Sequence, residues 1–245
     1  MSTPDHVTAC CNTPPFKSNY TPKGLTETVA DIPVYFAGEK GKSAIILVHD
    51  IFGLKANTMQ LADTLAAHGF RVAAPDCFRG NPYETVPVVM ADLRAHLLYH
   101  APPEVVLRDS QSIAAHLRAE GAQKVGALGL CWGGRKVCEL AAVEGAVDAV
   151  ASAHPSQIDE AVVDAITVPV CFLPSMSEPD YVSIDDFLCE GILAKKPFAA
   201  RNVHRRFTTM RHGWIGARAN YDDPENVKGA QEATDILADF FKANL

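Results

Sequence analysis

The stretch "KVGALGLCWGG", residues 124–134, decides the fold that we expect for this chain. Residues 124–130 form an apolar run of strand length, and Cys131 follows at once, with Gly129 and Gly133 two positions away on either side. Such a run is typical of a strand buried on both faces of a sheet. A G-x-nucleophile-x-G sequence between a strand and a helix indicates a nucleophile elbow. We therefore predict that Cys131 is a nucleophile at a tight strand-to-helix turn.

Outward from this stretch, strand and helix patterns alternate along the chain. The sequence predicts strands over residues 32–38, 44–49, 70–76, 124–130, 146–154, 168–175 and 204–210. It predicts helices over 55–69, 133–145, 157–166, 184–195 and 224–245, and two more between 85 and 120, separated at Pro102–Pro103. This alternation is typical of an α/β protein with a mostly parallel central sheet and helices on both faces. We expect an N-terminal tail over residues 1–23 and a single domain over residues 24–245.

Composition narrows the class of protein. With 48% hydrophobic and 21% charged residues, the chain has the make-up of a soluble globular protein. A net charge of −7 argues against a nucleic-acid partner. No apolar run is long enough to span a membrane, and the N-terminus lacks the apolar core of a signal peptide. We expect a cytoplasmic monomer or homodimer that acts on a small molecule.

The seven cysteines favour free thiols, because no C-x-x-C pair occurs and the number is odd. Cys10 and Cys11 are adjacent, but only His6 lies near them as a further metal ligand. We therefore expect neither a metal site nor a cofactor.

Partners for Cys131 are expected just after the other strands, because reacting groups collect at the carboxyl ends of the strands in such a sheet. His212 follows the last predicted strand and is the expected general base, since the histidine comes last in the chain order of this architecture. Asp180 lies in the loop after strand 168–175 and is the preferred orienting acid, with Glu178 in the same loop as the alternative. His154 also ends a strand, and we expect it to line the pocket or to be a structural histidine.

Two backbone amides are expected to form an oxyanion hole. One belongs to Trp132, the residue after the nucleophile, and the other to Ile51, in the loop after strand 44–49. The start of the following helix favours a thiolate at Cys131, because the helix dipole stabilises negative charge there.

Five motifs resemble those of the dienelactone hydrolases, also called carboxymethylenebutenolidases. They are "HDIFG" (49–53), "APDCFRG" (74–80), "GLCWGG" (129–134), "EPDYV" (178–182) and "RHGW" (211–214), and the resemblance spans residues 24–245. The stretches "ACCNTPP" (9–15) and "AHPS" (153–156) resemble the eukaryotic branch of this family. The resemblance implies an α/β-hydrolase fold and the hydrolysis of small lactones or esters through an acyl-thioester, without a cofactor.

The resemblance also implies roles for particular residues. Cys131, Asp180 and His212 would form the catalytic triad, with Ile51 and Trp132 as the oxyanion hole. Asp50 matches an acidic residue, glutamate in the family archetype, that holds the resting thiol until substrate displaces it. The alternative for Asp50 is a loop carboxylate that caps the following helix.

The substrate-binding arginine is where this sequence departs from the family. The bacterial enzymes place an arginine four residues beyond the catalytic histidine, where this chain has Gly216. Arg218 is the nearest arginine, and Arg79 and Arg94 are further candidates. We expect residues 80–103 to form a lid over the pocket.

Other functions remain open at this stage. A ligand receptor with this fold could keep the pocket without turnover. A glutamine amidotransferase-like hydrolase also uses a cysteine elbow, but His212 lacks the H-x-E pair of those enzymes because Gly213 and Trp214 follow it. A thiol-redox protein would use Cys131 together with the adjacent pair Cys10–Cys11.

Overall fold

The computed structural model describes residues 13–176, 178 and 191–245. These residues form an eight-stranded sheet in the order β1-β2-β4-β3-β5-β6-β7-β8. The strands are β1 (Leu25–Val29), β2 (Ile32–Ala37), β3 (Ser43–Val48), β4 (Arg71–Pro75), β5 (Lys124–Leu130), β6 (Ala149–Ala153), β7 (Val170–Leu173) and β8 (Val203–His204). From β4 to β8 all neighbours are parallel, whereas β1 and β2 join the edge in antiparallel pairs. The predicted mostly parallel sheet is confirmed.

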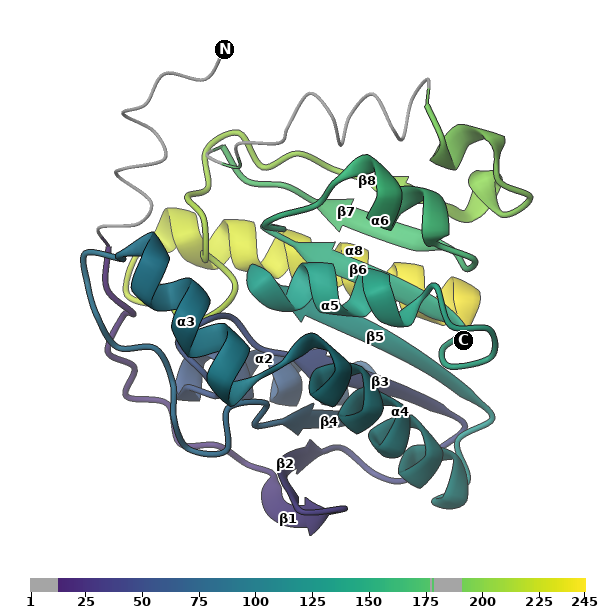
Figure 1. The fold of residues 1–245 in the computed structure, drawn as a ribbon, viewed down its shortest axis with the longest axis horizontal. Helices are drawn as coiled ribbons and strands as arrows, with labels where there is room; N and C mark the ends of the chain where they lie inside the picture. Colours follow the sequence, from purple (N-terminus) through teal and green to yellow (C-terminus); the bar gives the residue numbers. More distant parts are fainter. Residues whose placement is uncertain (1–12, 177, 179–190) are drawn as a thin grey trace.

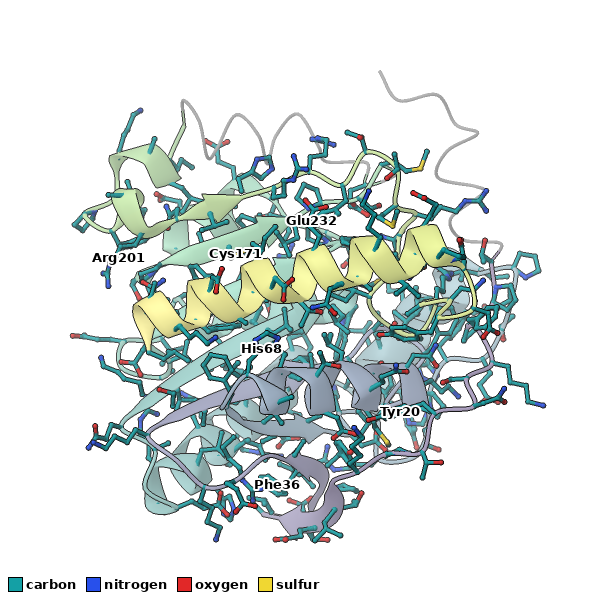
Figure 2. The ribbon with its side chains drawn as sticks, turned by 180° about the vertical axis from the view of Figure 1, so that it is seen from behind. Tyr20, Phe36, His68, Cys171, Arg201 and Glu232 are labelled. Atoms are coloured by element: carbon teal, nitrogen blue, oxygen red, sulfur yellow. The ribbon has the colours of Figure 1, made fainter. Side chains whose placement is uncertain are left out.

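Helices cover both faces of the sheet, as Figure 1 shows. One face carries α3 (Met90–His100), α4 (Pro103–Ala119), α5 (Trp132–Leu140) and α6 (Glu160–Ala165). The other face carries α2 (Ala56–Ala67) and α8 (Pro224–Asn244), which lie side by side in Figure 2. At the end of α2, His68 Nε2 lies 3.8 Å from Asp235 Oδ1 of α8. Two short 3-10 helices, η1 (Leu193–Lys195) and η2 (Ala199–Arg201), precede β8.

The sheet divides the core into two clusters because successive strand residues point to opposite faces. In β3, Ile46 and Val48 pack with the cluster under α4 and α5, whereas Ile45 and Leu47 pack with the cluster under α2 and α8. All four side chains are fully buried. A strand covered on both faces needs apolar residues at every position, which explains the continuous run "AIILV" (44–48).

Three of the differences between the predicted and the observed elements have a clear physical reason. The edge strand β1 was not predicted, because four of its five residues, in "LTETV", are exposed and give no apolar signal. The strand predicted over 204–210 is wrong beyond His204: the chain pairs once more, at Phe207 with Ser175, and then turns. The helix predicted over 133–145 ends at Leu140 and continues as turns up to Gly145, which has a φ of 71°. Most of the helix predicted over 184–195 lies outside the described residues.

Residues 13–23 form neither helix nor strand, yet polar contacts tie them to the sheet and to α2. Asp63 of α2 accepts hydrogen bonds from the Tyr20 hydroxyl at 2.7 Å, the Lys23 amide at 2.9 Å and the Tyr35 hydroxyl at 2.7 Å. Burial and the bond to Asp63 raise the pKa of Tyr35 to about 12. The segment is thus fixed beside α2, where Figure 2 labels Tyr20.

None of the described helices is long and apolar enough to cross a bilayer.

Candidate active site

Cys131 lies in the single-residue turn between β5 and α5, as the elbow prediction requires. Its φ of 54° and ψ of −116° lie in a region that L-residues rarely adopt, at a cost of about 1–3 kcal/mol. Backbone hydrogen bonds hold this conformation: the Cys131 amide donates to Ala153 O, and its carbonyl accepts from the amides of Gly134 and Ser156. The strained backbone leaves the side chain partly exposed at the carboxyl edge of the sheet.

The flanking glycines are required by close backbone approach. A Cβ on Gly129 would lie 2.1 Å from the carbonyl oxygen of Gly133. A Cβ on Gly133 would lie 2.4 Å from the carbonyl oxygen of Val48. Both distances are too short for a side chain, so β5 can lie this close to the start of α5, and α5 this close to β3, only with glycine at these positions.

A buried carboxylate orients His212 beside the cysteine. His212 Nδ1 lies 2.8 Å from Glu178 Oε1, and the Glu178 side chain is fully buried. Ser175 donates two further hydrogen bonds to this carboxylate, one from its hydroxyl at 2.6 Å to Oε1 and one from its amide to Oε2. The carboxylate can accept from Nδ1–H, which leaves Nε2 of His212 to face the thiol.

The pKa of Cys131 is lowered by its surroundings. Burial raises the pKa of the thiol, but the charge of His212 and a hydrogen bond to it outweigh burial and make the net shift downward. Ser156 adds a smaller lowering contribution, with its Oγ 3.8 Å from Cys131 Sγ. These contacts favour a thiolate paired with an imidazolium.

The loop after β7 carries both candidates for the orienting acid. Asp180 lies outside the described residues. Glu178, the alternative in the same loop, is the carboxylate that contacts His212. The two are separated only by Pro179 in the sequence, so the order of motifs along the chain does not distinguish them.

Asp50 has the geometry of a loop-fixing carboxylate. Its Oδ1 accepts from the amide of Phe52 at 2.9 Å, and its Oδ2 accepts from the amide of Ala217 at 3.0 Å. It joins the loop after β3 to the loop after His212. Its negative charge also raises the pKa of Cys131, so it lies close enough to act on the thiol electrostatically.

The two amides expected to form the oxyanion hole belong to Trp132 and Ile51. Trp132 is the first residue of α5, so its amide has no partner within the helix. The Ile51 carbonyl accepts from the amide of Tyr83, while its own amide makes none of the backbone hydrogen bonds found among the described residues. Both amides are therefore available to a ligand.

Two further histidines are neutral and buried. His154 packs edge-to-face on His212, with ring centroids 4.8 Å apart, and within the described structure neither of its ring nitrogens has a hydrogen-bond partner. Burial and the neighbouring His212 lower its pKa well below the usual value. His49 Nδ1 donates to Asp50 O at 2.7 Å and its Nε2 accepts from the Cys77 amide at 3.0 Å, so it is a structural histidine. His154 thus lies at the site, whereas His49 supports the loop beneath it.

The candidate arginines have different surroundings. Arg218 lines a cavity of about 620 Å³ together with His212. Its Nε donates to Thr13 O at 2.7 Å, and its guanidinium lies 4.9 Å from the centre of the Phe52 ring. Thr13 and Phe16 line the same cavity, and the Phe16 amide donates to Ala217 O at 2.9 Å.

The guanidinium of Arg79 is already paired. It lies 2.8 Å from Asp109 and 3.5 Å from Asp31, and these ion pairs account for it without a substrate. The family's arginine position, Gly216, is buried: a Cβ there would lie 3.0 Å from Asp50 Oδ2 and 3.5 Å from His154 Nε2. Arg94 lies on α3 within the predicted lid, and it lines a groove with Trp132.

The sequence analysis did not identify two serines that contact polar groups of the site. Ser156 contacts the thiol and Ser175 binds the orienting carboxylate. Each follows a strand at the carboxyl edge of the sheet, which is the signal that could have identified them. Among residues 13–176, 178 and 191–245, no cluster of three metal-ligating side chains occurs.

Similarity to known proteins covers most of the chain. Residues 32–245 match the model of the Dienelactone hydrolase family. An uncharacterized AIM2 family protein of Schizosaccharomyces pombe is 29% identical over 249 residues, which cover 95% of this chain and 98% of that protein. The hydrolase pyvD of Aspergillus violaceofuscus is 31% identical over 210 residues, 84% of each chain.

A solved structure shares the architecture. The crystal structure of a putative dienelactone hydrolase from Klebsiella pneumoniae matches with a TM-score of 0.69 and 20% identity, covering 86% of this chain and 92% of that one. At this identity the likeness concerns the fold alone. It confirms the α/β-hydrolase fold expected from the sequence.

Proposed function

The chain belongs to the dienelactone hydrolase family, and we propose that it hydrolyses small lactones or esters with Cys131 as its nucleophile. The observation that carries this proposal is the contact of His212 with buried Glu178 on one side and with the Cys131 thiol on the other. A nucleophile, a base and an orienting carboxylate in this arrangement are the parts that covalent acyl transfer needs. We propose that residues 24–245 form the catalytic domain.

The first half of the reaction forms an acyl-enzyme. The Cys131 thiolate attacks the substrate carbonyl carbon, and the negative charge that develops on the carbonyl oxygen is stabilised by the amides of Ile51 and Trp132. His212, protonated and held by Glu178, donates its proton to the departing oxygen as the tetrahedral intermediate collapses. The products of this half are an acyl-thioester on Cys131 and an alcohol, which remains attached to the acyl group if the substrate is a lactone.

The second half releases the acid. His212, now neutral, removes a proton from water, which attacks the thioester carbonyl. The same two amides stabilise the second tetrahedral intermediate, and its collapse expels the Cys131 thiolate. Glu178 stabilises the imidazolium of His212 at each stage by accepting from Nδ1–H.

Substrate contacts are proposed at the cavity that His212 and Arg218 line together. A cation at this place would attract an anionic substrate group. His154 lies beside His212, and burial lowers its pKa and so favours its neutral form.

The experiment is steady-state turnover of dienelactone and of 4-nitrophenyl acetate by the purified protein and by two variants, Cys131→Ala and Cys138→Ala. Cys138 lies on α5, the helix that follows Cys131, and is buried, so it is the matched control. We expect many turnovers of at least one substrate, lost in Cys131→Ala and kept in Cys138→Ala. Absence of turnover in a protein whose Cys131 still reacts with iodoacetamide would overturn the proposal and favour a receptor or redox role.

A further inference from the structure

A groove of about 740 Å³ runs between α3 and α5, and none of its lining residues lines the cavity beside His212. From α3 it is lined by Met90, Arg94, Leu97 and Leu98, and from α5 by Trp132 and Lys136. Figure 1 shows α3 beside α5 on the same face of the sheet. The groove is therefore built from the predicted lid and from the helix that begins at the nucleophile.

The lining of the groove includes the chain neighbours of Cys131 and of Ser156. Trp132, on its floor, is the residue after Cys131, and Gln157 follows Ser156, whose Oγ lies 3.8 Å from Cys131 Sγ. Two separate chain segments thus connect the thiol and its serine contact with the lining of the groove.

Apart from Arg94, the residues of α3 that line the groove are apolar, and two of the large ones are more than half exposed. Met90 and Leu98 are 56% and 60% exposed, and Leu93 is the buried residue of the helix. Met90, Arg94 and Leu98 are spaced by four residues, so they form one row along the helix with neighbours about 6 Å apart. A cation thus lies between two exposed apolar side chains.

Arg94 has no ion pair or hydrogen bond within the described part of the chain, although most of the other arginines there are paired. Lys136 faces the same groove, but its ammonium is bonded to Glu139 at 2.7 Å. Arg94 is therefore the cation that the groove offers to a ligand. An apolar channel with one unpaired guanidinium matches an acyl chain that carries an anionic group.

Resting on the function proposed above, we propose that this groove binds the acyl part of the substrate and that the preferred acyl chain ends in a carboxylate. His212 protonates the departing oxygen, so the alcohol part must lie on the His212 side, and the acyl part extends toward Trp132. Methylene groups of the acyl chain pack on Met90, Leu97 and Leu98, and the terminal carboxylate binds Arg94. Such a substrate is a monoester of a medium-length dicarboxylic acid.

The test compares two esters that differ only at the end of the acyl chain, 4-nitrophenyl hexanoate and mono-4-nitrophenyl adipate, each corrected for its spontaneous hydrolysis. The ratio of kcat/KM for adipate over hexanoate reports recognition of the carboxylate. We expect Arg94→Gln to lower this ratio about fivefold, the size of a partly exposed ion pair. Arg201→Gln removes the same charge from the far end of the molecule, labelled in Figure 2, and should leave the ratio unchanged.

A second pair of variants tests the apolar wall. Leu98→Glu places a carboxylate in the groove, whereas Tyr99→Glu places one on the adjacent residue of the same helix, which is 81% exposed and does not line the groove. We expect Leu98→Glu to lower kcat/KM for hexanoate about tenfold relative to Tyr99→Glu, because each buried methylene is worth roughly fourfold. Equal effects of the two variants would refute the proposal.

Binding separates this inference from the proposed function. Calorimetric titration of monomethyl adipate and of methyl hexanoate into Cys131→Ala protein needs no turnover. Tighter binding of monomethyl adipate, lost in Arg94→Gln and kept in Arg201→Gln, supports the groove even if no ester is hydrolysed. Cys131-dependent turnover of 4-nitrophenyl acetate without any preference for the anionic chain would leave the hydrolase proposal standing and overturn this one.

Discussion

Replacing Glu178 by glutamine tests the hydrogen bonds through which its carboxylate holds His212. Among the described contacts, the two carboxylate oxygens accept from three donors: the Ser175 amide, the Ser175 hydroxyl and His212 Nδ1. Glutamine offers one oxygen and one NH₂ group in place of the two oxygens. Whichever way the amide is turned, an N–H group faces a donor that the carboxylate had satisfied.

Each orientation of the amide has a definite consequence. With its nitrogen toward the Ser175 amide, one buried donor loses its partner, which costs about 1–3 kcal/mol. With its nitrogen toward His212, Nδ1 must become an acceptor, so Nε2 carries the proton and cannot take one from Cys131. In both orientations the negative charge opposite the imidazolium is lost. We expect kcat to fall by about 10³ to 10⁴, the scale found when the orienting carboxylate of a catalytic triad becomes an amide.

The assay is turnover of 4-nitrophenyl acetate together with scanning calorimetry. The lost hydrogen bond, at about 1–3 kcal/mol, predicts a melting temperature lower by roughly 2–12 °C, since about 1 kcal/mol shifts a protein of this size by about 2–4 °C. Asp180→Asn is the control, because Asp180 is the acid expected from the family pattern. Activity of Glu178→Gln within threefold of the unchanged protein, with activity lost in Asp180→Asn, would refute the assignment of Glu178.

Three further outcomes are expected. Because His212 lowers the pKa of Cys131 despite burial, iodoacetamide should alkylate it at a pH where an ordinary thiol is protonated, while Cys138, whose pKa burial raises to about 12, stays unreactive; mass spectrometry distinguishes the two sites. Asp50→Asn removes a charge that raises the pKa of Cys131, so the alkylation profile should move to lower pH; a move to higher pH would contradict this electrostatic role. Gly133→Ala places a Cβ 2.4 Å from a carbonyl oxygen and should cost about 1–3 kcal/mol of stability in calorimetry, with a loss of turnover; unchanged stability and turnover would refute the need for close approach.

The fold could be predicted from the sequence because its central strands are covered on both faces. Runs such as 44–48 and 124–130 are apolar at every position, and each is followed by a turn and a helix. Edge elements gave no such signal. In β1 a polar, exposed sequence is held by backbone pairing to β2, and in β8 the pairing stops after two residues.

The site residues that could be predicted are those that come directly after a strand in the sequence. Cys131 was marked by the glycines that the elbow needs, and His212 by its place after the last strand. The choice between Glu178 and Asp180 could not be made, because both lie in one loop and only the three-dimensional path of the loop decides which reaches the imidazole. The ion pair between Arg79 and Asp109 could not be predicted from the sequence either, because it joins residues 30 positions apart that only the tertiary structure brings together.

The hydrogen bond from Arg218 to Thr13 joins residues 205 positions apart and makes the start of the chain part of the cavity beside His212. The residue at which the expressed protein begins is therefore expected to affect its measured substrate preference. A shortened protein that begins at Lys17 would lack Thr13 and Phe16, one wall of that cavity, and its substrate preferences would be those of a different binding site. For directed evolution, the same contact adds four positions, residues 13–16, to any library meant to change substrate specificity. A library limited to the sheet and its loops would not include them.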